Sequence, residues 1–231
     1  MALTFLTFVA AMAIFVAATA IRYLRPAVAM ATIVVMALWL TYAGALGYFG
    51  VIGDPALPGP AFLLIPVFLF VFLFLTRSEP AARIAYAIPL GLLIGAQVFR
   101  VGVELALHQL WLAGLAPRML TYSGANYDIV IGLSAPLVAW LYARGNIGER
   151  AALAWNALGI ALLVNIATRA LLTAPGPLHV LAAEVSDRAI GTFPYSYIPG
   201  FLALLALVLH VLAIRALRAR LRARQPVPAI G

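Results

Sequence analysis

The sequence predicts an all-α integral membrane protein, with seven transmembrane helices in a single domain that covers residues 1–231. Of the 231 residues, 65% are hydrophobic and only 10% are charged, whereas soluble domains carry about 25% charged residues. The apolar residues form runs that reach the ~20 residues a helix needs to cross a bilayer. Short stretches rich in Pro, Gly and Arg separate these runs.

Three residue types limit the possible functions. The chain has no cysteine, which excludes disulfides, thiolate metal sites and cysteine nucleophiles. It also has no lysine, since all 15 basic residues are arginine, and a retinal Schiff base is therefore excluded. The net charge of +8 does not indicate nucleic-acid binding, because the arginines follow the ends of the apolar runs.

The first three spans are predicted at residues 2–22, 27–50 and 61–76. No basic residue precedes the first run, and Arg22 and Arg25 follow it, a pattern that favours a retained span over a cleaved signal peptide. Pro26 opens the second run. The third run has no polar face and is expected to contact lipid over much of its circumference.

Four more spans are predicted at residues 82–114, 126–143, 151–172 and 199–216, followed by a basic tail at 217–231. The first of these exceeds the length of a span, so it is tilted, kinked at Pro89 or projects from the bilayer. Residues 173–198 form the longest connection and are rich in Pro and Gly. A connection of this length is a candidate lid.

The distribution of arginines predicts the orientation. One set of predicted loops holds eleven arginines: Arg22, Arg25, Arg77, Arg83, Arg144, Arg150, Arg215, Arg218, Arg220, Arg222 and Arg224. The opposite set holds only Arg118 and Arg188. Basic loops stay in the cytoplasm. The protein is therefore expected to lie in the cytoplasmic membrane, with its N-terminus outside the cell and its C-terminus in the cytoplasm. The Arg-rich tail is expected to bind anionic lipid.

The candidate site begins with a polar stripe in the run 82–114. Gln97, Arg100, Glu104 and His108 follow one another at intervals of three or four residues, which puts them on one helical face. Charged groups inside a membrane are costly, and they commonly mark functional sites.

Other spans bring polar residues to a similar depth, counted at about 1.5 Å per residue from the predicted outer ends. We therefore predict one polar pocket among the last four spans, opening outward beneath the long connection. Its further members are Asn126, Asp128, Asn165, Arg169 and His210.

Each of these residues also has a purely structural interpretation. Arg100 and Glu104 can form an i,i+4 ion pair, and Asn126 and Asp128 suit the cap and first turn of a helix. Further alternatives are an interfacial position for His108, snorkelling of Arg169 to the surface and a helix–helix hydrogen bond from His210.

The segments TYSGANYDIVIGLSAP, NIATRALLTAPGPLH and AIGTFPYSYIPGF, together with Arg100 and Glu104, resemble an uncharacterised family of bacterial seven-helix integral membrane proteins. The resemblance covers roughly the C-terminal 60% of the chain. It implies the seven-helix architecture and no activity.

Two classes of function remain open. The favoured one is a non-enzymatic protein that binds or moves a small polar or anionic ligand, or protons, without a cofactor. The alternative is an intramembrane enzyme with a metal held by Glu104, His108, Asp128 and His210, or with a haem between the two histidines. Against a metal, the sequence has no HExxH motif and the nearby arginines repel cations. The sequence does not determine the oligomeric state.

Overall fold

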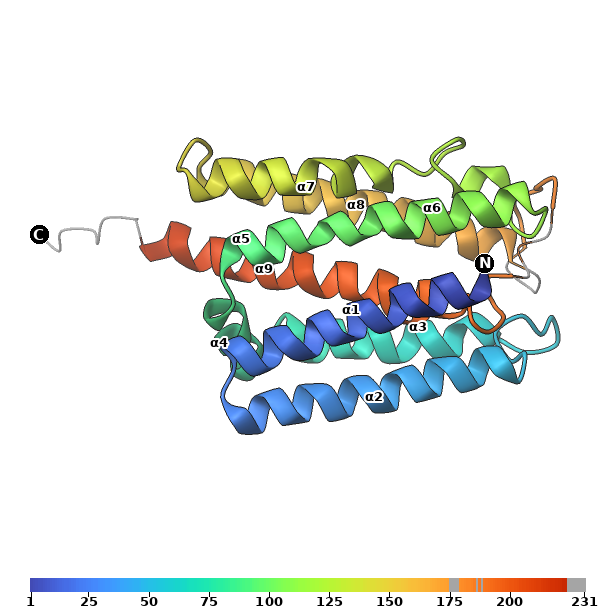
Figure 1. Cartoon of the computed structure of the whole chain (residues 1–231), viewed down its shortest axis with the longest axis horizontal. Helices are drawn as coiled ribbons and strands as arrows, with labels where there is room; N and C mark the ends of the chain where they lie inside the picture. Colours follow the sequence, from blue (N-terminus) through green and yellow to red (C-terminus); the bar gives the residue numbers. More distant parts are fainter. Residues whose placement is uncertain (175–178, 186, 188, 224–231) are drawn as a thin grey trace, which may run out of the picture.

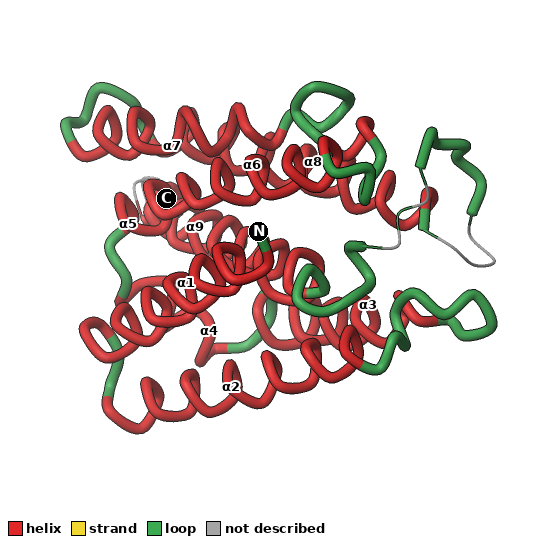
Figure 2. Tube along the Cα trace, turned by 45° about the vertical axis from the view of Figure 1, so that its right-hand side comes forward, coloured by secondary structure: helices red, strands yellow, loops and turns green. Residues whose placement is uncertain are grey.

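The computed structural model describes residues 1–174, 179–185, 187 and 189–223. Within these ranges the chain is all-α, with no strand. Long helices run back and forth along one axis, and the first helix begins at the opposite end of the bundle from the end of the last described helix (Figure 1). Nearly all of the described non-helical segments lie at these two ends (Figure 2).

The first helices form one side of the bundle. α1 (Ala2–Tyr23) and α2 (Pro26–Tyr48) pack against each other, and Pro26 takes the first helical turn, where its missing N–H costs nothing. α3 (Gly59–Leu69) continues into a π-helical turn, η1 (Phe70–Leu75). Many side chains of α3 and η1 are exposed apolar groups, including Ile65 and Phe68, as expected of a lipid-facing helix.

The predicted continuous helix 82–114 is broken in the structure. α4 (Glu79–Ala87) bends by 82° from the preceding helix and ends before Ile88, whose backbone is extended at φ −87° and ψ 130°. A proline disfavours the α conformation in the residue before it, and Pro89 follows Ile88. The chain then resumes as α5 (Leu90–Gly95), a 3₁₀ turn η2 (Ala96–Val98) and α6 (Phe99–Leu112).

Five further helical elements follow in the described part of the chain. They are a short 3₁₀ turn η3 (Arg118–Leu120), α7 (Asp128–Ala143), α8 (Glu149–Thr173), a π-helical turn η4 (Ile198–Leu202) and α9 (Ala203–Ala223). α8 and α9 form the most extensive helix pair. α9 runs through the middle of the bundle (Figure 1) and supplies much of the core, including Leu205, Leu209 and Leu217.

Several of these helices suit a membrane. Within the described residues, α1, α2, the α5–α6 run, α8 and the η4–α9 run are long and apolar enough to cross a bilayer, which makes five helices, or six if the bent pair of α3–η1 and α4 is one span. α7 is apolar but has only 16 residues.

Arginine gathers at one end of the bundle. The α1–α2 and α7–α8 connections, α4 and the C-terminal end of α9 lie together at that end (Figure 1). These segments and their flanks carry ten of the eleven arginines of the predicted basic set. The eleventh, Arg224, lies outside the described residues together with 225–231 of the predicted tail, as does Arg188. Residues 217–223 of that tail continue α9.

Candidate functional site

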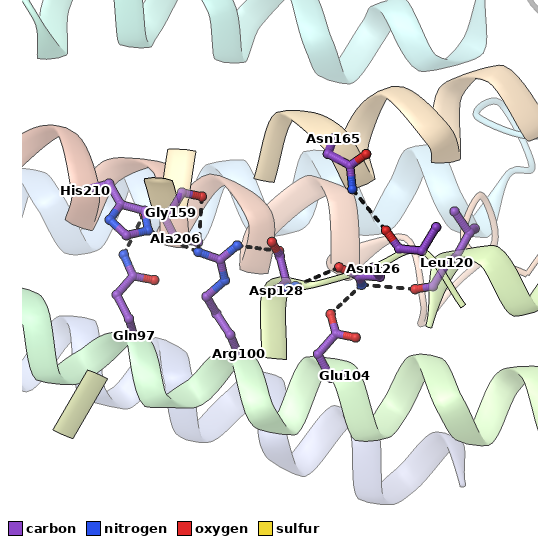
Figure 3. A network of polar contacts seen from close by, with 11 residues as sticks. Gln97, Arg100, Glu104, Leu120, Asn126, Asp128, Gly159, Asn165, Ala206 and His210 are labelled. Atoms are coloured by element: carbon purple, nitrogen blue, oxygen red, sulfur yellow. Dashed lines mark hydrogen bonds and ion pairs between the residues drawn. The ribbon is translucent and has the colours of Figure 1, made fainter. Parts of the chain in front are cut away.

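The polar stripe of α6 and η2 faces the interior of the bundle. Gln97, Arg100 and Glu104 are 0%, 2% and 1% exposed, and they point toward α7, α8 and α9 (Figure 3). Gln97 Nε2 donates to the carbonyl of Ala206 on α9, at 3.0 Å. The stripe therefore binds its own helix to the central one.

Arg100 pairs with a carboxylate on a different helix. Its Nη2 forms an ion pair with Asp128 at the start of α7, and both side chains are over nine-tenths buried. Nη1 donates to His210 Nε2 at 3.0 Å and lies 3.5 Å from the carbonyl oxygen of Gly159. The predicted i,i+4 pair of Arg100 with Glu104 is corrected, because Arg100 turns across the bundle toward α7 and α9.

The contacts of His210 fix its protonation state. Asn156 Nδ2 donates to the carbonyl of Ala152 at 2.8 Å, which leaves Asn156 Oδ1 facing His210 Nδ1 at 2.9 Å. An amide oxygen only accepts, so Nδ1 carries the hydrogen. Nε2 then holds the lone pair that accepts from Arg100, and the imidazole is neutral.

Gly159 on α8 makes room for this imidazole. A Cβ at this position would lie 2.3 Å from both His210 Cε1 and Nε2. The ring of Trp155 lies on the same helix, with its centroid 5.7 Å from that of the imidazole. α8 thus holds the ring in place next to Arg100.

Glu104 belongs to a second, neighbouring group of polar contacts. Asn126 Nδ2 donates to Glu104 Oε1 at 2.5 Å and to the carbonyl of Leu120 at 3.0 Å. Asn126 Oδ1 accepts the backbone N–H of Asp128 at 3.1 Å. Asn126 therefore joins the Glu104 carboxylate of α6 to the backbone at the start of α7. The predicted helix cap is not formed, because Tyr127 occupies the N-cap position and no side chain caps α7.

The other predicted residues lie farther from Arg100. Asn165 donates to the carbonyl of Ala125 at 3.1 Å, and Arg169 Nε donates to Asn165 Oδ1 at 3.0 Å. His108 stacks on Tyr122, with ring centroids 4.5 Å apart. These side chains are half-buried and hold the α6–α7 connection against α6 and α8.

A small cavity lies between the two groups and the central helix. It has a volume of about 50 Å³, and a water molecule needs about 10–15 Å³ of such space. One wall is polar and the rest is apolar, with α6, α8, η4 and α9 all contributing. The lining residues are Arg100, Glu104, Asn126 and Asp128 on the polar side, and Phe99, Val103, Leu107, Leu163, Ile166, Ile198, Leu202, Ala203 and Ala206 on the apolar side.

Two carboxyl oxygens of the polar wall have no hydrogen-bond donor. They are Glu104 Oε2 and Asp128 Oδ1, and both are buried. The backbone N–H of Tyr122 lies near the Glu104 carboxyl but does not reach hydrogen-bonding geometry with Oε2.

Residues 57–218 match the family model of a domain of unknown function, DUF8737. The chain belongs to this family. The matched stretch of DUF8737 contains every residue of the two polar groups and of the cavity, and it leaves out α1 and α2. No curated protein and no solved structure matches the chain.

The DUF8737 stretch does not assemble the metal or haem site considered from the sequence. Across residues 1–174, 179–185, 187 and 189–223, no group of three or more His, Asp and Glu side chains gathers around a point. Arg100 stands between His210 and Asp128, and a guanidinium there repels a cation at His210. The rings of His108 and His210 have separate sets of partners.

The connection before α9 contacts the α6–α7 connection and the helix α2 at its end of the bundle. Glu184 accepts the backbone N–H of Arg118 at 2.5 Å, and this bond holds the pKa of the carboxyl below its usual value. Tyr197 and Ser196 lie so close to α2 that a Cβ on Gly44 or Gly47 would be 2.5 Å or 2.2 Å from their hydroxyl oxygens. The connection therefore ties the start of α9 to α2.

Asp187 is the buried acid of this connection, with only 4% of its surface exposed. Burial raises the pKa of the Asp187 carboxyl to about 7, although the backbone N–H of Ile190 partly offsets the effect. One of its oxygens, Oδ1, has no hydrogen-bond partner.

Two members of the network were missed from the sequence. Asn156 is fully buried and Gly159 touches His210. An amide in the middle of an apolar run is the signal that points to Asn156. For Gly159 the signal is weaker, because glycines are common in membrane helices for packing reasons alone.

Proposed function

We propose that the chain is a seven-span protein of the bacterial cytoplasmic membrane, with its N-terminus outside and its C-terminus inside. The alternating direction of seven helical segments supports this, with α3–η1 and α7 as the two shorter spans. So does the gathering of arginines at the end where α9 finishes. α4 would then lie along the cytoplasmic surface, because it bends by 82° from α3 and η1.

The arginine-rich end is the proposed contact with anionic lipid. Arg220 Nη1 donates to the hydroxyl of Tyr142 at 2.8 Å, and Arg144 lies over the ring of Trp140, 5.0 Å from its centroid. Arginine beside Tyr and Trp is typical of the headgroup region, where each basic group gains about 1 kcal/mol from an anionic surface.

The proposed activity is the binding or movement of protons or of a small polar ligand through the cavity between α6, α7, α8 and α9. One observation carries this proposal: an ion pair that is over nine-tenths buried and a third buried ionisable side chain share the wall of the cavity. Structural packing does not require three ionisable groups here, and buried charges in membrane proteins are typical of ion and substrate paths. Ile198 ends the connection before α9 and lines the cavity, which supports access from the outer side.

Single cysteines test the orientation, since the chain has none of its own. Ala56→Cys is in the exposed α2–α3 loop and Asn146→Cys is in the exposed α7–α8 loop. In intact cells the first is expected to react with a membrane-impermeant maleimide, and the second only after the cells are opened. The reverse pattern would show that the orientation is inverted.

Reconstitution tests the activity. Liposomes that contain the protein and an internal pH-sensitive dye are given a membrane potential with potassium and valinomycin. Faster acidification than in empty liposomes, lost in Glu104→Gln but retained in Glu79→Gln, supports proton movement. Glu79 is a matched control because its pair with Arg83 is over two-thirds exposed. Rates equal to those of empty liposomes would remove proton movement from the proposal.

A further inference from the structure

The buried groups around the cavity do not balance in charge. Arg100 carries one positive charge, while Glu104 and Asp128 carry two negative charges when both are ionised. His210 adds none, because its contacts with Asn156 and Arg100 fix it as the neutral tautomer. An uncompensated charge at this depth costs several kcal/mol, so one more positive charge is required.

No other basic group of the cavity wall supplies it. Arg100 and Glu104 are on α6, and Asp128 begins α7. In contrast, α8, η4 and α9 present only apolar residues to the cavity, such as Leu163, Leu202 and Ala206. Arg169 on α8 is held by Asn165. Among the described residues, no further positive charge lines the cavity, so a cation from outside the chain would have to supply it.

The two free carboxyl oxygens indicate where it binds. Glu104 Oε2 and Asp128 Oδ1 are buried without donors, and both residues line the cavity. Each carboxyl has its other oxygen occupied, by Asn126 in one case and by Arg100 in the other. The free oxygens are therefore available to the same small guest.

We infer that Glu104 and Asp128 together hold one monovalent cation, either a proton or Na⁺, in this cavity. Hard oxygen ligands suit Na⁺, and the cavity of about 50 Å³ has room for an ion with a water molecule. A divalent ion would overcompensate the single excess charge, and Ca²⁺ requires six to eight oxygens. This inference rests on the proposed function and specifies its cargo.

The first test is thermal unfolding of the purified full-length protein in detergent. NaCl is titrated against N-methylglucamine chloride at constant ionic strength, at several pH values. If Na⁺ is the guest, Tm rises by roughly 5–10 °C at a hundredfold excess over its Kd, and less at low pH, where protons compete. Glu104→Gln is expected to abolish the rise, and Glu79→Gln to keep it.

The second test identifies a proton. If a proton is the guest, the infrared spectrum of the wild type contains the carbonyl stretch of a buried protonated carboxyl group, and Glu104→Gln removes it. The inference is overturned if the wild type shows neither Na⁺-specific stabilisation nor this band. It is also overturned if Glu104→Gln shows either signal unchanged from the wild type. If Glu104→Gln does not fold, Glu104→Asp is expected to shift the Na⁺ midpoint or the band, and an unshifted value counts against the site.

These binding measurements stand apart from the liposome assay. Binding without flux would remove transport from the proposed function and leave the cation site standing. Flux without either binding signal would remove the cation site and leave transport in the proposed function.

Discussion

His210 Nδ1 lies 2.9 Å from Asn156 Oδ1, and this contact decides which nitrogen of the imidazole faces Arg100. Replacing Asn156 with Leu removes the acceptor and leaves a buried N–H without a partner. We expect a loss of about 1–3 kcal/mol in unfolding free energy, measured by reversible unfolding in mixed detergent micelles. Asn146→Leu, on an exposed loop, is the control. A similar loss in both variants would mean that the contact contributes nothing specific.

The space at Gly159 gives a second prediction. Gly159→Ala puts a methyl group 2.3 Å from the imidazole, so the ring has to move away from Arg100. We expect a lower Tm and a change in the fluorescence of Trp155, whose ring is 5.7 Å away. Gly91→Ala, where a Cβ meets nothing within 4 Å, is expected to be neutral or stabilising. Equal behaviour of the two variants would contradict the close packing at Gly159.

The partner of Arg100 can be identified by a double-mutant cycle. Arg100→Met strands the Asp128 carboxylate, and we expect a loss of about 3–5 kcal/mol. Adding Asp128→Leu removes the stranded charge and should recover most of that loss. Adding Glu104→Leu instead should recover much less, since the ion pair joins Arg100 to Asp128. If Glu104→Leu recovered more stability than Asp128→Leu, Arg100 would be paired with Glu104, the i,i+4 pair that the sequence suggested.

Asp187 predicts a pH dependence of stability. Its pKa is about 7 in the folded protein and close to 3.9 when unfolded, so the folded state binds the proton more tightly. Stability is therefore highest at acid pH and falls as pH rises between about 4 and 7. Asp187→Asn should flatten this decline, by a few kcal/mol at most. The measurement is Tm against pH for both proteins, and parallel curves would refute the assignment.

The helices were largely predictable, because apolar runs of this length have few alternatives. The break at Ile88 was among the options that Pro89 allowed, and the 82° bend at α4 was not. The angle depends on how α4 packs against α9, which a single sequence does not encode locally.

Helical spacing predicted which polar side chains share a face of one helix, but not their partners on other helices. Spacing placed Arg100 and Glu104 on one face, as the structure has them. Spacing within one helix gives no information on how neighbouring helices are rotated, and that rotation gives Arg100 to Asp128 and His210.

The π-helical turn η4, Ile198–Leu202, sets the angular phase of everything that follows it in α9. One residue in an α-helix corresponds to a rotation of about 100°, and a π turn holds an extra residue without breaking the helix. Deleting one residue from η4 would leave α9 helical but turn the whole of it, His210 included, by about 100° relative to Arg100. The contact between Arg100 and His210 thus depends on the winding of a turn that contains neither of them.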